Sequence, residues 1–250
     1  EYIDELPYLS FIVSSKNDGY AQGNNKGLHF AIQDNSINQI LILNNDVLFV
    51  EDIISNLTIS LESLPQAAIV SPILYKKNMH ELDYNCARKN HSNWSIILPF
   101  LFLYYNFFGL LTYFSNKLYL IKNKRINLNV EHIEIELPSG SCMLFKKNLM
   151  SKIQIFDPGT FLYYEENILY KQIEQIKLKN YLIPRLKCIH IGASSTSKEK
   201  SYFVSYSSLK SATFYLEKYG KISFFQRMVF FIAKRFFGMK IFFLKLKQDL

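Results

Sequence analysis

Short apolar runs that end abruptly in polar residues alternate along this chain with segments of helical periodicity. The run Ile40 to Leu43 is followed by two asparagines and Asp46, and Ala67 to Ile73 is a second run of this kind. Runs of this length predict buried strands, and Leu6 to Ser15 predicts one more. Strands that alternate with helices favour an α/β fold, with a mostly parallel sheet flanked by helices.

The same patterns predict the remaining elements. Helices are expected over residues 24–34, 47–64, 146–152 and 165–178. A small-residue turn before residue 142 leads into a short strand, residues 156–159 form a turn, and strand pieces follow over 181–183 and 186–191. The intervening segment 75–95 is polar and irregular, and its lone His80 and His91 are expected at the surface.

Asp46 has two interpretations. A carboxylate delivered to the carboxyl edge of a sheet stands where open α/β sheets hold ligands, and it can bind Mg²⁺ or Mn²⁺ together with phosphate oxygens. Alternatively, Asp46 caps the helix expected from Val47, which has Glu51 and Asp52 in its first turn. This stretch alone favours the cap.

The segment from Gly19 to Gly27 contains three glycines in nine residues. A loop of this composition lets backbone approach a ligand, and its amides would open onto a helix N-terminus suited to anions. Its spacing fits neither the dinucleotide-binding fingerprint nor the P-loop. Ordinary turns use the same residues.

Two further places carry candidate chemistry. Glu165 and Glu166 stand at the start of an expected helix, where the helix dipole alone favours acidic residues and where one carboxylate could also take a proton from a hydroxyl. His190 ends a strand beside a small-residue loop, so it could ligate a metal or contact a phosphate, or simply be packed.

The formal net charge of +8 is concentrated in the C-terminal tail. Nine Lys and Arg lie in residues 210–250 against Glu217 and Asp249, so the rest of the chain is nearly neutral, which argues against a nucleic-acid partner. Helices are expected over 202–219 and 222–246, and the second is basic, rich in Phe and amphipathic as far as Gly238. Such a helix suits an anionic membrane surface. Alternatively, it packs on the sheet, with the aliphatic parts of its Lys side chains extended so that the ammonium groups reach water.

Residues 96–114 carry no charge, within an apolar insertion that we place at about 92–125. Nineteen residues approach the ~20 needed to cross a bilayer as a helix, but Pro99, Asn106 and Gly109 interrupt them. A membrane span, an interfacial segment and a buried insertion are all compatible with this pattern, and we favour the last two. The three widely spaced cysteines indicate a reducing compartment and packing roles.

Taken together, the motifs resemble bacterial family 2 glycosyltransferases of the rhamnosyltransferase-like kind, which have the Rossmann-related GT-A fold. The family pattern N-x-G-(Y/F)-A-x-G-N-N-x-G is matched by residues 17–27, and its metal-site ending L-N-N-D by residues 43–46. The patterns G-x-x-(M/L)-L, F-D-x-x-x-F-(L/F)-Y-x-E-(D/E) and V-H-x-x-G-x-S-T resemble residues 140–144, 156–166 and 189–196. The resemblance covers residues 8–197.

This resemblance implies a role for each matching residue. Glu166 would be the general base of an inverting transfer, with Glu165 as its supporting neighbour. Asp46 and His190 would hold a divalent cation, Mg²⁺ or Mn²⁺, against the diphosphate of a nucleotide-sugar donor. The remaining donor-binding positions would be Asn17, Gly23, Asn24, Asn25, Asn44, Gly140 and Ser141.

The resemblance also sets expectations for the whole chain. The chain begins at the family's second strand, so the first strand-helix unit, about 40–50 residues, is expected to be missing and one sheet edge exposed. Residues 1–200 would form the glycosyltransferase domain and 201–250 a membrane-associating helical tail. The implied activity adds a sugar to a lipid-linked surface polysaccharide, in the cytoplasm at the inner face of the cell membrane. The alternative is a non-catalytic remnant or a membrane-bound partner subunit.

Overall fold

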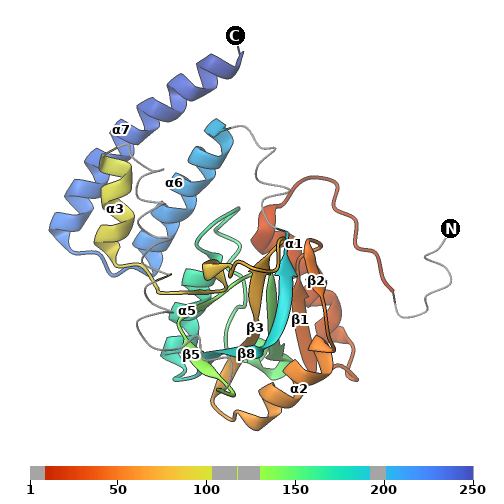
Figure 1. Cartoon of the computed structure of the whole chain (residues 1–250). Helices are drawn as coiled ribbons and strands as arrows, with labels where there is room; N and C mark the ends of the chain where they lie inside the picture. The colour runs from red at the N-terminus through yellow and green to blue at the C-terminus, as the bar shows by residue number, and fades with distance from the viewer. Residues whose placement is uncertain (1–8, 103–116, 118–129, 192–200, 250) are drawn as a thin grey trace.

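The computed structural model describes residues 9–102, 117, 130–191 and 201–249. The helices are α1 (Gly19–Gln33), α2 (Ile53–Ser63), α3 (Asn93–Leu101), α5 (Glu165–Gln175), α6 (Ser201–Lys218) and α7 (Phe224–Asp249), with short 3₁₀ turns at Tyr84–Cys86 and Lys147–Ser151. The strands are β1 (Gln39–Leu43), β2 (Val47–Phe49), β3 (Ala67–Lys76), β4 (Ala87–Arg88), β5 (Ile133–Ile135), β6 (Leu137–Pro138), β7 (Cys142–Lys146) and β8 (Lys179–His190). Figure 1 shows the sheet with its helices.

The main sheet has the strand order β1-β7-β3-β8-β2, and β5 also pairs with β8. Among the described strands of this sheet, only β3 and β8 pair in parallel, while each other pair is antiparallel. The expected α/β class is therefore confirmed, but the expected mostly parallel sheet is wrong, because the sheet is mixed. The physical reason is β7, which lies between β1 and β3 and runs against both.

Helices cover both faces of this sheet. On one face α2 packs its apolar side onto β3 and β8 through Ile53, Leu57 and Leu61. On the other, α1 and α5 pack onto the sheet and contribute Leu28 and Ile173 to the second core cluster. The strands supply both cores because successive side chains point to opposite faces.

A third cluster joins α3, α6 and α7 beside the sheet (Figure 1). Phe100 of α3 packs edge-to-face against Phe237 of α7, with ring centroids 4.9 Å apart. Within the expected apolar segment 96–114, Ile96, Ile97 and Phe100 are buried here while Phe102 is exposed, and residues 103–114 lie outside the described residues. In the part of the chain that is described, no helix is long and apolar enough to cross a membrane. The predicted division near residue 200 falls in 192–200, outside the described residues.

The N-terminal predictions need two corrections. Residues 9–15 form no strand and follow an extended path outside the sheet with exposed apolar side chains, while residues 6–8 lie outside the described range (Figure 1). Helix α1 begins at Gly19, so the expected glycine-rich loop is itself helical. Burial of Ala21 and Leu28 against the sheet outweighs the cost of about 1 kcal/mol for each helical glycine.

The helix expected over 47–64 divides in two. Val47 to Phe49 is strand β2, which pairs with the end of β8, and the helix proper begins at Ile53. Its N-cap is Asp52, whose side chain accepts a hydrogen bond from the Ser55 N–H. The interpretation of Asp46 as a helix cap is therefore wrong. The separate strand pieces expected over 181–191 form one strand, β8.

Asp157 joins α6 to the body of the fold. Its carboxylate is 3% exposed and accepts hydrogen bonds from Lys218 Nζ at 2.6 Å and Tyr219 Oη at 2.5 Å. Burial acts to raise the pKa of Asp157, but these two donors outweigh it and hold the pKa below its ordinary value. The stabilisation is therefore present at neutral pH and lost as the pH falls through that lowered pKa.

Replacing Asp157 by Ala is expected to lower the free energy of unfolding by about 2–3 kcal/mol, because charge-assisted hydrogen bonds at a buried site are lost. Urea unfolding at pH 7 measures the change, with the exposed Glu131→Ala as a charge-matched control. Equal midpoints for the two variants would show that this contact does not fasten α6.

Candidate functional site

A pocket of about 320 Å³ opens at the carboxyl edge of strands β1 and β8. Its wall includes Asn44, which follows β1, and His190, which ends β8. The turn Ser139–Ser141 before β7 and the N-terminus of α5 complete it. Residues separated by more than a hundred positions in sequence therefore surround one cavity, since these strand ends meet at one edge of the sheet.

Glu166 projects into this pocket from the first turn of α5. Its Oε1 accepts a hydrogen bond from the Gly140 N–H at 3.1 Å and lies 3.0 Å from an Arg88 guanidinium nitrogen. Tyr20 donates to the Gly140 carbonyl at 2.5 Å, which fixes the same turn from α1. Both contacts of Glu166 suit a carboxylate, and a Cβ added at Gly140 would lie 2.8 Å from its Oε1.

Glu165 differs from its neighbour in being 4% exposed. Its Oε1 has no hydrogen-bond partner within the described structure. Burial, and then repulsion from Glu166, raise the pKa of Glu165 to about 8. With a pKa of about 8, Glu165 holds a proton at pH 7. Adjacent carboxyl groups in such different environments are suited to different chemical roles.

The backbone before this pair is strained. Tyr163 and Tyr164 have φ values of 76° and 70°, a region that costs non-glycine residues about 1–2 kcal/mol each. Helix α6 holds the turn in place, because Tyr215 stacks on the Tyr164 ring at 5.6 Å and Ser211 donates to the Leu162 carbonyl at 2.8 Å. Strain maintained by neighbouring structure is frequent at functional sites. Here it directs α5 and its two carboxyl groups toward the pocket.

His190 lies between two carboxylates. Its Nδ1 is 3.1 Å from Asp83 Oδ2, and its Nε2 is 3.6 Å from Asp46 Oδ1. The hydrogen bond with Asp83 raises the pKa of His190. Burial acts to raise the pKa of Asp83, but hydrogen bonds from His190 and from the Asn85 N–H lower it overall. Asp83 thus orients the ring so that Nε2 faces Asp46.

This arrangement fits a cation that uses two protein ligands. A metal-binding histidine usually hydrogen-bonds through its other nitrogen to a carboxylate, as His190 does with Asp83. The 3.6 Å distance to Asp46 is too long for a hydrogen bond but is that of an ion pair when the ring is protonated, so Nε2 and Asp46 Oδ1 are neighbours. Among the described residues, no group of three or more His, Cys, Asp or Glu could hold a metal. Further ligands would have to come from water or phosphate oxygens.

The sequence-predicted residues fall into two sets. Asn44, Gly140, Ser141, Glu165, Glu166 and His190 line the pocket, and Asp46 lies beside His190. The structure does not bring Asn17, Gly23, Asn24 or Asn25 into the pocket lining. The side-chain oxygen of Asn17 accepts from the Gly19 N–H, while the amides of Asn24 and Asn25 bind the carbonyls of Tyr20 and Phe156. Their donor-binding roles remain predictions.

Sequence reasoning assigned no role to several residues of this region, among them Tyr20, Asp83, Arg88 and His91. Arg88 stands on a two-residue strand whose pairing with β6 sets it beside the Ser139–Ser141 turn. His91 was expected at the surface, but it is half-buried and lines the pocket, and burial lowers its pKa to about 4. No local pattern marks Asp83, Arg88 and His91, which lie in the polar segment that separates β3 from α3, while Tyr20 lies on α1 within the motif of residues 17–27.

Fold and pocket together define an α/β protein with a polar, carboxylate-bearing cavity at a sheet edge. No protein-family profile matches the chain, and no curated protein matches it either. Among solved structures, the chain is similar to A197 from STIV, with a TM-score of 0.45 and 13% identity over 73% of this chain and 72% of that one.

Proposed function

We propose that the pocket transfers a sugar, with inversion, from a nucleotide-diphosphate sugar to an acceptor hydroxyl of a lipid-linked saccharide at the inner face of the cell membrane. One observation carries the proposal. Glu166 and His190 line the same cavity, and Asp46, far from both in sequence, lies beside His190. These are the residues to which the sequence resemblance assigns the proton acceptor and the cation site.

In this proposal the Glu166 carboxylate accepts the proton of the acceptor hydroxyl. The hydroxyl oxygen then forms a bond to the anomeric carbon, and the bond from that carbon to the diphosphate oxygen breaks with its electron pair leaving on the nucleoside diphosphate. A divalent cation bound by Asp46 and His190 would neutralise charge on the departing diphosphate. Asp83 keeps the His190 ring in the required orientation.

Arg88 supplies a further positive charge to this site. One of its terminal nitrogens pairs with Glu166, while its Nε has no hydrogen-bond partner in the described structure. A guanidinium that lines the pocket suits oxygens of a bound diphosphate, which would compete with Glu166 for its terminal nitrogens. Donor binding would thereby loosen the ion pair and free the carboxylate to accept a proton.

Titration with nucleoside diphosphates tests the proposal. One of UDP, GDP, dTDP or CDP is expected to raise the melting temperature, and Mn²⁺ should increase that rise. A ligand at 100 times its Kd adds about 2.7 kcal/mol to the free energy of unfolding. The Asp46→Asn variant should lose the Mn²⁺-dependent part, because one of two protein ligands is gone.

The matched control is Asp52→Asn. It removes the same charge from a neighbouring position, and asparagine caps a helix as well as aspartate does. This variant should respond to nucleotide and Mn²⁺ like the parent. If no nucleoside diphosphate shifts the parent with or without Mn²⁺, the proposal fails.

A second candidate is a non-catalytic partner subunit of a glycosyltransferase. Strand β1 lies at an edge of the sheet, and its outer side pairs with no other strand in the described structure. The pocket, at about 320 Å³, is also at the lower end of the range for small-molecule sites. An open strand edge is suited to pairing with another chain. This role predicts no nucleotide-dependent shift in melting temperature.

A further inference from the structure

Helix α7 has an exposed apolar face, although Phe225 near its N-terminus lies beside Trp94 of α3, with ring centroids 5.9 Å apart. Ten large hydrophobic side chains of α7 are exposed, among them Phe224 at 78%, Phe225 at 64% and Phe243 at 65%. At about 100° per residue, all ten fall within an arc of about 140°. The stripe runs without a break from Phe224 to Leu246, so the amphipathicity does not end at Gly238 as the sequence suggested.

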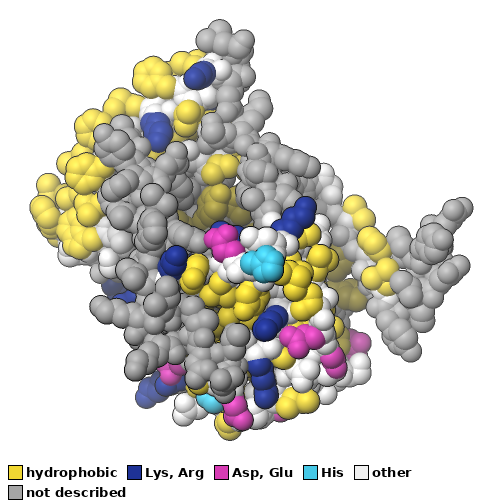
Figure 2. All heavy atoms as spheres, viewed as in Figure 1, with side chains coloured by type: hydrophobic (Ala, Val, Ile, Leu, Met, Phe, Trp, Pro, Cys, Tyr) yellow, Lys and Arg dark blue, Asp and Glu magenta, His cyan; other side chains and the backbone are white. Residues whose placement is uncertain are grey.

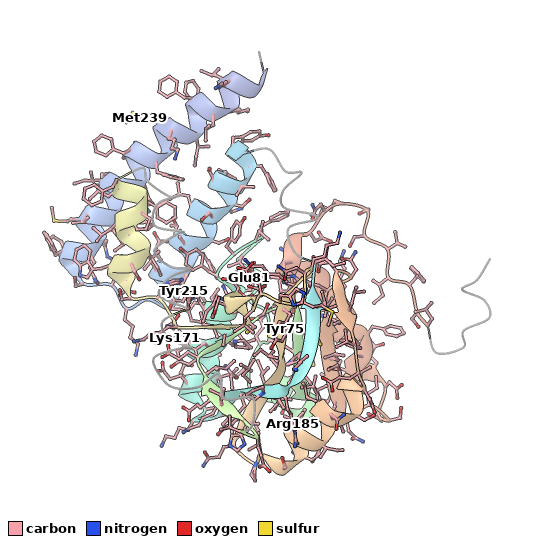
Figure 3. All side chains as sticks on the ribbon, in the orientation of Figure 1. Tyr75, Glu81, Lys171, Arg185, Tyr215 and Met239 are labelled. Carbon is pink, nitrogen blue, oxygen red and sulfur yellow. The ribbon has the colours of Figure 1, made fainter. Side chains whose placement is uncertain are left out.

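The opposite face of α7 belongs to the fold. Phe230, Ala233 and Phe237 are buried against α3 and α6 in the third core cluster. Figure 3 shows Met239 projecting from α7 on the side away from α6, and Figure 2 shows hydrophobic side chains gathered along this edge of the molecule. The helix is thus fastened by one apolar face and presents a second one outward.

Cations border the outward stripe on both sides. On a helical wheel Arg227, Lys234 and Lys245 fall along one border, and Lys240 and Lys247 along the other. Arg235 lies within the stripe, with its guanidinium over the Phe231 ring at 5.1 Å. Helix α7 carries no acidic residue before Asp249, and although Lys234 pairs with Glu217 of α6 at 3.3 Å, the other cations give the outward face a positive charge.

We propose that this face of α7 binds the surface of an anionic lipid bilayer, with the helix lying in the plane of the interface. An exposed Phe-rich stripe enters the boundary between headgroups and acyl chains, while flanking Lys and Arg reach the anionic headgroups. A second copy of the chain is a poorer occupant, because two such faces would bring their cationic borders together. A protein partner would have to be acidic along both borders of an apolar groove.

Docking through α7 also orients the pocket. Helix α6 packs against α7, and its Ser211 and Tyr215 contact the strained turn before Glu165. Figure 3 shows Tyr215 near the end of α6 that faces the sheet. A bilayer-bound α7 therefore holds the pocket at a fixed place relative to the membrane. The inference goes beyond the proposed function and does not depend on the chemistry of the pocket.

Co-flotation with lipid vesicles tests the inference. The full chain is expected to float with phosphatidylcholine vesicles containing one third phosphatidylglycerol, and at least tenfold less with phosphatidylcholine alone. The double variant Phe231→Ser, Phe242→Ser should reduce the partition coefficient at least tenfold, since both phenyl rings belong to the outward stripe. Neutralising the second border with Lys240→Gln and Lys247→Gln should reduce binding to anionic vesicles about tenfold.

Matched controls change the same residue types elsewhere. Phe11→Ser with Phe30→Ser removes two exposed phenyl rings outside α7, and Lys77→Gln with Lys152→Gln removes two exposed charges. These controls should bind like the parent, and melting temperatures show that every variant is folded. Equal binding by stripe and control variants, or lipid-independent dimerisation through α7 without flotation, would overturn the inference. A nucleotide-induced shift in melting temperature without flotation would leave the proposed sugar transfer standing but not the membrane face, and flotation without a nucleotide-induced shift would leave only the membrane face.

Discussion

The Glu166→Gln variant is expected to transfer sugar about 10²–10⁴ times more slowly than the parent, which is the usual contribution of a positioned general base. Glutamine keeps the shape of the side chain, and its amide oxygen can still accept from Gly140 and Arg88 as the carboxylate does. It cannot take up a proton from the acceptor hydroxyl. The nucleotide-induced rise in melting temperature should therefore persist while the rate falls.

A single-turnover assay with the nucleotide sugar chosen by the titration measures the rate. Glu174→Gln is the matched control, because Glu174 lies on the same helix α5 but outside this pocket, paired with Lys171. It should transfer at the parental rate. Equal rates for Glu166→Gln and the parent would remove Glu166 from the chemistry, whatever the nucleotide titration shows.

Single residues of this pocket could be predicted from the sequence, whereas the strand directions and long-range contacts that bring them together could not. Asn44 and His190 could be found because each stands where an apolar run stops, and the end of a buried strand is a place where ligands bind. Glu166 could be found from its place at the start of a helix. These signals are local. A local sequence pattern predicts the structure correctly where burial of one face of the element determines it.

Strand direction and the supporting residues could not be found in this way. An apolar run shows that a strand is buried but not which way it runs, so the antiparallel insertion of β7 between β1 and β3 left no trace in the pattern. Arg88 pairs with Glu166 and Asp83 with His190, and in each pair the two residues are more than seventy positions apart in sequence. Helix α1 was misplaced because its glycines resemble a loop, while tertiary burial of Ala21 decided otherwise.

Glu165 gives the largest expected pH effect on stability. Its pKa rises from 4.5 to about 8 on folding, so between these values the folded state binds one proton more than the unfolded state. Stability must then fall as the pH rises, by about 1.4 kcal/mol per pH unit from this group. The Glu165→Gln variant lacks this titrating group. Its free energy of unfolding, relative to that of the parent, should therefore rise by about 3–5 kcal/mol between pH 4.5 and pH 9.

Urea unfolding of parent and variant at several pH values measures this difference. A buried amide adds a cost of its own, but this cost does not change with pH, so the slope of stability against pH is the informative quantity. Glu174→Gln, on the exposed side of α5, should run parallel to the parent. Parallel curves for Glu165→Gln would mean that Glu165 is ionised in the folded protein at neutral pH.

The slope also separates the roles of the two carboxyl groups. A Glu165 that keeps its proton at pH 7 cannot accept one from a hydroxyl, although it lines the pocket. It can still limit the negative charge next to Glu166, because two ionised carboxylates on one helical turn would repel each other. Diverging stability curves would therefore leave Glu166 as the proton acceptor and make Glu165 the residue that lets it stay charged beside Arg88.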